Sequence, residues 1–449
     1  MPSLRVLSAV SARPLRALAL GALGGLGLLC LQACAATEGR DSEPDGPVVG
    51  TYLDPLVRGG ILEAPKDGSA AVTGAPDGSA AAEGPRLEDL APGYRPPADG
   101  DEAALWQSAD ELEAELRASG SVIDDPELTG YMKEVVCRLA ASHCADIRVY
   151  VVSGGGFTAS MSPNGMMEIG TGALLRLRSE AELAAVIGHE LGHYLRRHSL
   201  QGLRSAKAEL ADFVASREDF DTFRLRLRSL LLEITRFSRF HEREADGYAL
   251  RLLAEANYAP SAVARLWRRM SKEFHASEEV RRESVFFSSH PLMKERSEVL
   301  SVLALEVRTW MGATPVVGRD SYLRRTGARR LDFLRAELTA WEFPQMRTAL
   351  EGLLADDDPN PAELHYFIGE TYRLGNEDED LVRALESYEM ARKAEGEAPP
   401  ELHRSRGLLL RQMGDLPAAA AAFRQYLDAL PDARDRALTE DLLRRLEAS

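Results

Sequence analysis

The 449-residue chain is poor in positive charge and in cysteine. Its 70 acidic residues outnumber 54 Lys and Arg, and the net charge of −16 excludes the basic footprint that non-specific nucleic-acid binding requires. Four cysteines are too few to build a disulfide scaffold at this length. After residue 33, no stretch reaches ~18 uncharged apolar residues, which excludes a polytopic membrane protein. What is present, 45% hydrophobic and 28% charged residues, is typical of globular domains.

The first 33 residues have the layout of a secretory signal, with three arginines, no acidic residue and an apolar run over residues 15–31. Losing this segment makes the mature chain more acidic still. The run ends in Leu-Gln-Ala-Cys at residues 31–34, which resembles the lipobox of bacterial lipoproteins. Cleavage before Cys34 would leave its thiol for diacylglycerol attachment. The alternatives are a plain signal peptide cut near Ala35 and an uncleaved anchor.

The lipobox and the cysteine count predict the same compartment. By resemblance to lipoprotein sorting, Ala35 in place of Asp favours the outer membrane, so we expect a periplasm-facing outer-membrane lipoprotein of the cell envelope. Cys30 would leave with the signal and Cys34 would be lipidated, so Cys137 and Cys144 remain as a pair in an oxidising compartment. A disulfide between them would close a small loop. Two buried free thiols are the alternative.

Three further segments follow the signal. Residues 34–100 are rich in Gly, Pro, Ala and Asp and predict a flexible tether, because such a composition buries too little apolar surface to offset the entropy lost on ordering. Residues 101–312 predict an α+β domain that is mostly helical and carries a small sheet. Residues 331–449 predict all-α helical hairpins spaced like tetratricopeptide repeats, with an unrelated helical bundle as the alternative.

The expected elements of the middle segment follow from periodicity and capping signals. Helices are expected over residues 101–119, 126–142, 179–198, 203–255 and 260–275, and from His290-Pro291 to about 311. A strand is expected over residues 147–152, and a hairpin joins residues 157–161 to 166–170. In the last segment, the small and aromatic repeat positions are Gly369, Tyr372, Ala384, Tyr388 and Ala391, then Gly407, Ala419, Phe423 and Pro431.

The sharpest chemical signal is His-Glu-Leu-Gly-His at residues 189–193. On a helix, His189 and His193 are separated by four residues, so both imidazoles project from one face and suit two positions of a tetrahedral zinc ion. Glu190 lies between them, placed to take a proton from a zinc-bound water whose pKa the metal lowers. The motif predicts a catalytic zinc site that needs a third protein ligand and an open position.

Glu242 is the expected third ligand, since it lies in a helical stretch four residues before Asp246. With this spacing Glu242 can bind the metal while Asp246 orients a ligand histidine from outside. Glu244 is a weaker rival for the ligand role, and His241 is expected to point elsewhere on its helix. The remaining histidines are expected at surface or packing positions: His143, His198, His275, His365 and His403.

These motifs resemble the HtpX/CAAX-protease/OMA group of gluzincin metallopeptidases. Residues 179–193 with Arg197-His198 look like its catalytic helix, residues 238–246 like its second motif, and Ser289-His290-Pro291 with Arg296 like its third. A protease domain followed by tetratricopeptide-like repeats is most similar to the periplasmic β-barrel-assembly-enhancing (BepA) type. The membrane helices of the HtpX and CAAX branches are absent, so the resemblance does not extend to intramembrane cleavage.

The resemblance implies a zinc-dependent endopeptidase of the bacterial cell envelope with one zinc ion per chain. It would degrade unfolded or misassembled periplasmic and outer-membrane proteins through attack by a zinc-bound water, on a substrate paired with an edge strand around residues 166–169. Its repeats would bind outer-membrane assembly machinery, its lipid anchor would bind the membrane, and nucleic acid is no partner. The alternative is an envelope chaperone or assembly adaptor with little or latent proteolysis.

His290 is the second candidate for a catalytic role, and this too is implied by the resemblance. It lies before Pro291, which disfavours helical geometry at the preceding residue. As a donor near the zinc, His290 would stabilise the oxyanion of the transition state. As a fourth ligand it would displace the water and hold the enzyme latent. The remaining possibility is a surface histidine that caps the next helix.

Overall fold

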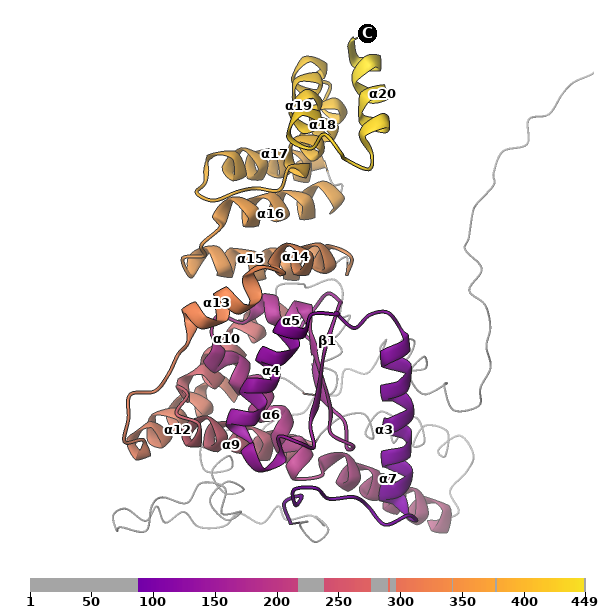
Figure 1. Cartoon of the computed structure of the whole chain (residues 1–449), viewed down its shortest axis with the longest axis vertical. Helices are drawn as coiled ribbons and strands as arrows, with labels where there is room; N and C mark the ends of the chain where they lie inside the picture. Colours follow the sequence, from indigo (N-terminus) through magenta and orange to yellow (C-terminus); the bar gives the residue numbers. More distant parts are fainter. Residues whose placement is uncertain are drawn as a thin grey trace, which may run out of the picture. The chain divides into compact units, whose positions relative to one another are not determined.

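The computed structural model describes residues 88–216, 238–275, 290, 296–340, 342–375 and 378–447. The signal segment, Cys34 and residues 35–87 of the tether lie outside these ranges, so their expected roles remain predictions. The end of the expected tether is described and packs on the domain, since Leu90 is buried and its amide donates to the Leu195 carbonyl, so the tether prediction is wrong for residues 88–100. Among the described helices, none combines the length and the apolar character needed to cross a membrane. The α+β, mostly helical class is confirmed, since the described elements are helices around one small sheet (Figure 1).

The sheet has three strands in the order β1-β3-β2: β1 is Arg148–Val152, β2 is Ala159–Met161 and β3 is Met166–Gly170. The expected hairpin is confirmed, because β2 and β3 pair antiparallel with Ser160 opposite Glu168. β3 also pairs in parallel with β1. The expectation of an edge strand around residues 166–169 is therefore wrong. β3 is the central strand, and β2 forms the edge beside it.

Helix α6, Glu180–Leu195, crosses the centre of the domain, and each of its 16 residues is buried. The expected capping box opens it, with the Ser179 hydroxyl accepting from the Glu182 amide at 3.3 Å. The helix ends three residues earlier than expected, because Arg197 turns the chain with a φ of 56°. Helix α7, His198–Ser216, then begins at the histidine expected to close α6.

Helix α9, Arg239–Glu255, packs against α6. Ser238 caps the start of α9, and its hydroxyl accepts from the His241 amide at 3.2 Å. The helix expected over residues 203–255 is therefore not continuous. Two glycines of α6 allow the close contact. A Cβ on Gly192 would lie 2.8 Å from the Cα of Ala245, and one on Gly188 would lie 3.2 Å from the Cα of Ala249. The glycines thus set how near the two helices come.

The other described helices complete the fold in chain order. Those before the sheet and around α6 are α3 Asp101–Ala118, α4 Pro126–Leu139, the short η1 Ala141–His143, α5 Thr171–Arg176, α10 Ser261–Phe274 and α12 Arg296–Trp310. Those toward the C-terminus are α13 Arg319–Gly327, α14 Arg330–Leu338, α15 Phe343–Ala355, α16 Pro361–Gly375, α17 Asp378–Lys393, α18 Glu401–Gln412, α19 Leu416–Ala429 and α20 Arg436–Glu447.

One hydrophobic core runs from Leu90 through the α6 region to Leu409 in α18. Where the helices around α6 meet the C-terminal helices, α10 contacts α15 and α5 contacts α14. A buried ion cluster lies at the same place, where the Arg176 guanidinium of α5 donates to Glu273 of α10 and to Glu337 of α14. The helices α14–α18 therefore share their core with the helices that surround α6, and α19 and α20 pack on the end of α18 in a second, smaller cluster.

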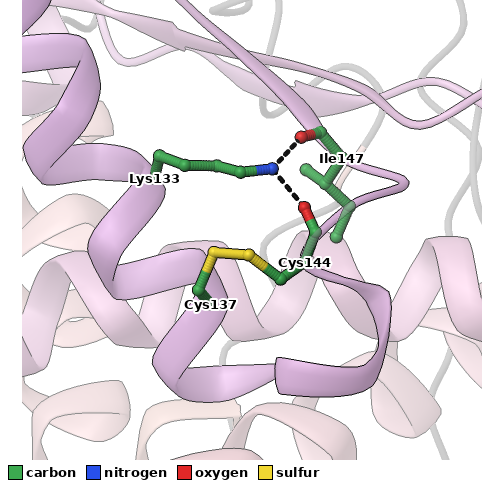
Figure 2. Close-up of a disulfide and its surroundings, with 4 residues drawn as sticks. All are labelled: Lys133, Cys137, Cys144 and Ile147. Carbon is green, nitrogen blue, oxygen red and sulfur yellow. Dashed lines mark hydrogen bonds between the residues drawn. A yellow bond between two sulfur atoms is a disulfide. The ribbon is translucent and has the colours of Figure 1, made fainter.

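A disulfide joins Cys137 near the end of α4 to Cys144 after η1, with the Cα atoms 4.7 Å apart (Figure 2). The Lys133 ammonium donates to the carbonyls of Cys144 and Ile147, and burial lowers the pKa of that ammonium. The disulfide and the lysine together hold the chain that leads from α4 into β1.

We expect Gly192→Ala to destabilise the protein by about 1–3 kcal/mol, because the added methyl group overpacks the α6–α9 contact. Gly130→Ala is the matched control, since this exposed glycine of α4 has nothing within 4 Å of an added Cβ. The control should be neutral or gain up to ~1 kcal/mol of helix stability. Thermal unfolding of the two variants checks this. Equal effects would show that the glycine does not set the helix spacing.

Candidate metal centre

A buried cluster of donor atoms lies where α6, α9 and the start of α12 meet. His189 and His193 come from α6, Glu242 from α9, and His290 from the chain ahead of α12. One ligand atom from each of these residues lies within 4.8 Å of the others, and each residue is at most 3% exposed. The structure thus brings together the expected ligands and His290.

The spacing of these atoms fits a tetrahedral metal ion. His189 Nε2 lies 3.1 Å from His193 Nε2 and 3.3 Å from His290 Nδ1. Glu242 Oε1 lies 2.9 Å from His290 Nδ1 and 3.4 Å from His193 Nε2. A zinc ion with ligands at about 2.1 Å requires tetrahedral edges of about 3.4 Å. The observed separations are close to that value.

Asp246 and Arg296 hold His189 in place on the side of its ring that faces away from the ligand cluster. The His189 Nδ1–H donates to Asp246 Oδ1 at 3.1 Å. Arg296 donates to both oxygens of Asp246, at 2.6 and 2.7 Å, and its Nη1 lies 3.1 Å from Glu242 Oε2. The same guanidinium lies over the ring of Trp267, 4.1 Å from its centroid. Asp246 therefore orients the ligand histidine, as its spacing predicts, and Arg296 anchors both carboxylates.

The donor set itself suits a cation. Because Asp246 can only accept, His189 carries its proton on Nδ1 and turns the lone pair of Nε2 toward the cluster. Nε2 of His189 lies 3.6 Å from Glu242 Oε2, a carboxylate oxygen that also faces Arg296 Nη1 at 3.1 Å. A cation bound between Nε2 and the carboxylate would satisfy both acceptors. The residues present therefore fit a zinc ion.

The buried charges shift the pKa values around the cluster in opposite directions. Burial alone would raise the pKa of Glu242, but His290 and Arg296 outweigh it and hold that pKa well below its ordinary value. Burial likewise opposes ionisation of Asp246, and Arg296 reverses this and lowers its pKa. Burial lowers the pKa of His193 well below its usual range. Glu242 is thus ionised and His193 is neutral, as metal ligands must be, and Asp246 is ionised as the partner of His189. Burial would lower the pKa of His290, but the Glu242 and Glu190 carboxylates outweigh it and raise that pKa, so His290 must give up a proton in order to bind a metal ion.

Glu190 lies beside the cluster but outside the ligand set. It is 2% exposed, and its Oε1 lies 3.7 Å from His290 Nε2. Within the described ranges this oxygen accepts no hydrogen bond, so it is available to take a proton. Its place next to the two ligand histidines in sequence and beside the metal site in space is what a general base requires.

The structure also places His198 and Glu244 near the metal ligands, which sequence reasoning missed. His198 is fully buried, as a packing position would be, and its two nitrogens contact His193 and Glu244. Glu244 lies outside the ligand cluster, which contains Glu242. His241 lies outside the ligand cluster, as expected, and stacks on His198, with ring centroids 4.3 Å apart. The turn at Arg197 creates this arrangement. Because Arg197 is neither Gly nor Pro, its sequence gave no signal of the turn.

The other histidines outside the cluster lie where they were expected, at surface or packing positions. His143 is buried beside Asp146, with its Nδ1 3.5 Å from the carboxylate. His275 is exposed at the end of α10, and His365 and His403 are partly buried in the C-terminal helices.

Comparison with known proteins also indicates a metallopeptidase. Residues 123–304 match peptidase family M48. Over 172 residues the chain is 31% identical to the mitochondrial metalloendopeptidase OMA1 of Arabidopsis thaliana, an alignment covering 38% of this chain and 34% of the relative. It is 24% identical over 197 residues to the putative beta-barrel assembly-enhancing protease of Vibrio cholerae, covering 40% of each. It is 30% identical over 141 residues to the metalloprotease LoiP of Escherichia coli, covering 30% and 54%.

The chain thus spans between a third and just over half of the length of the curated relatives it matches. The matched part contains the candidate metal ligands His189, His193, Glu242 and His290, together with Glu190. The geometry of the cluster and the family match agree, and the chain carries a metallopeptidase domain of peptidase family M48 over residues 123–304.

Proposed function

We propose that the protein is a zinc-dependent endopeptidase in which His189, His193 and Glu242 hold one zinc ion and Glu190 is the general base. The observation that carries this proposal is the buried cluster of donor atoms at tetrahedral spacing next to a carboxylate that accepts no hydrogen bond within the described ranges. The family match to M48 supports the same activity.

When bound, the zinc ion polarises the peptide carbonyl and lowers the pKa of a water molecule to around 7. Glu190 accepts the proton from the attacking water and passes it to the leaving amine. Asp246 keeps His189 in its ligating tautomer, and Arg296 keeps Glu242 ionised and in place. A substrate in extended conformation would pair with the edge strand β2, which lies against α6, rather than with the central strand β3.

His290 acts in this proposal as a fourth ligand that holds the enzyme latent. Its Nδ1 lies 2.9 Å from Glu242 Oε1 and 3.3 Å from His189 Nε2, which suits one corner of the ligand tetrahedron. A catalytic zinc ion needs an open position, and a fourth protein ligand closes it. Substrate or a partner would have to displace His290 before cleavage.

We further propose that the enzyme acts in the bacterial cell envelope as a lipoprotein anchored through Cys34. The signal layout and lipobox support export, and the disulfide between Cys137 and Cys144 suits an oxidising compartment. The name of the Vibrio cholerae relative, a putative beta-barrel assembly-enhancing protease, supports unfolded or misassembled envelope proteins as substrates.

The C-terminal helices would form tetratricopeptide-like repeats that bind these substrates or the outer-membrane assembly machinery. Supporting this, a Cβ on Gly369 would meet the ring of Tyr388 at 2.5 Å, and one on Gly407 would meet the ring of Phe423 at 2.8 Å. Close helix pairs of this kind are typical of such repeats. The alternative, a chaperone or adaptor, is favoured by the buried His290 that closes the metal site.

Glu190→Gln should keep zinc but lower cleavage of unfolded casein by ~10²–10⁴-fold, because the general base is lost while the ligands remain. Glu242→Ala should instead lower the zinc content. Glu298→Gln, at an exposed position of α12, is the control. Full cleavage by Glu190→Gln would contradict the mechanism. Stoichiometric zinc in the wild type with no cleavage of any unfolded substrate would favour the adaptor.

His290→Ala should raise turnover of unfolded casein several-fold at matched zinc content, because it opens the fourth ligand position. The measurement compares initial rates of the variant and the wild type after their zinc content is determined. A large decrease would assign His290 to oxyanion stabilisation instead. Unchanged turnover would remove it from the catalytic site.

Cys34→Ala should abolish incorporation of a labelled fatty acid and release the protein from the membrane fraction, because the acceptor thiol is lost. The matched control is Cys30→Ala, which lies within the signal segment and should still be labelled. Unchanged labelling of Cys34→Ala would contradict the lipoprotein assignment.

A further inference from the structure

A chain of hydrogen bonds leads away from the metal site through His193. His198, which begins α7, is fully buried. Its Nδ1 lies 2.9 Å from Nδ1 of His193, and its Nε2 lies 2.9 Å from Glu244 Oε2. The other oxygen of Glu244 accepts from Arg196 Nε at 3.0 Å. These groups lie on the three helices α6, α7 and α9 and in the turn that follows α6, and folding joins them.

The chemistry of the groups fixes the direction of each hydrogen bond. The Glu244 carboxylate can only accept, so the Nε2–H of His198 donates to it. A metal-ligating His193 keeps its proton on Nδ1, so its Nδ1–H is the donor between the two rings and Nδ1 of His198 is the acceptor. His193 is left with a lone pair on Nε2, the atom that lies in the ligand cluster.

The surroundings of His198 hold its ring in place. His241 stacks on its ring at an interplanar angle of 20°. Arg196, itself paired with Asp89 at 2.8 Å, balances the charge of Glu244. The ring therefore has one tautomer and one orientation.

We propose that His198 is a positioning residue that holds His193 in its metal-ligating tautomer, with Glu244 and Arg196 as its anchor. The inference rests on the proposed metal site. Each ligand histidine of α6 is then linked to a carboxylate through its Nδ1–H. Asp246 accepts directly from His189, and Glu244 is linked to His193 through the imidazole of His198. Partners of this kind orient the ligand ring and raise its basicity toward the metal.

The test uses two amide substitutions of His198, to Asn and to Gln, each of which preserves the contact of one ring nitrogen. In His198→Asn, Oδ1 takes the place of Nδ1, because both atoms lie two bonds from Cβ, and it can still accept from His193. In His198→Gln, the amide nitrogen takes the place of Nε2 and keeps the contact with Glu244 but loses the acceptor for His193. His198→Leu removes both. His143→Leu, at a buried histidine outside the cluster, is the control.

The measurements are the zinc dissociation constant from chelator competition and the visible absorption of the cobalt-substituted full-length protein. His198→Gln and His198→Leu should bind zinc about 10–100-fold more weakly and change the cobalt spectrum. His198→Asn should remain within a few-fold of the wild type, as should His143→Leu. Thermal unfolding of the metal-free proteins shows that each variant is folded.

The outcomes separate this inference from the proposed function. A wild-type protein that binds no zinc would overturn the proposed function and with it the site on which the inference rests. Zinc binding by the wild type with equal affinity in all His198 variants would overturn the inference alone. Equal weakening of zinc binding in the Asn, Gln and Leu variants would also overturn the inference. The Asn variant keeps an acceptor for His193 at the Nδ1 position, so a role in fixing the tautomer requires that it bind zinc more tightly than the other two.

Discussion

The close contact between α6 and α9 is the constraint on which the site depends. At Gly192 the two backbones approach so nearly that a Cβ would lie 2.8 Å from the Cα of Ala245. Ala245 lies between Glu244 and Asp246 in sequence, and His193 follows Gly192 directly. The helix spacing therefore sets the distances between the ligand histidines and the carboxylates of α9. A wider spacing would move the carboxylates away from both imidazoles at once.

Charge balance is the second requirement of this interior. Glu190, Glu242 and Asp246 are buried together, and Arg296 is the guanidinium that contacts two of them. Removing one partner of a buried ion pair typically costs about 3–5 kcal/mol, because the remaining charge has no compensation. Arg296 therefore contributes to the fold as well as to the site, and a bound divalent cation would balance the remaining negative charge.

The parts of the structure that depend on local signals could be predicted from the sequence. The capping box at Ser179 and the four-residue spacing of His189 and His193 fixed the position and face of α6. The role of His198 could not be predicted, because it depends on a left-handed turn at Arg197 that no Gly or Pro announces. The central place of β3 was also missed, because its parallel pairing with β1 joins segments that are not adjacent in sequence.

The buried link between Arg176, Glu273 and Glu337 has a consequence for how the chain behaves as it loses structure. Each of the three side chains comes from a different helix, and the hydrophobic core is continuous on both sides of them. Detaching α14 would take Glu337 away from the Arg176 guanidinium, which would keep Glu273 as its partner, and would also open the hydrophobic core that α14 shares with the helices around α6. The helices around α6 and the helices α14–α18 should therefore melt in a single cooperative transition, not as two independent modules.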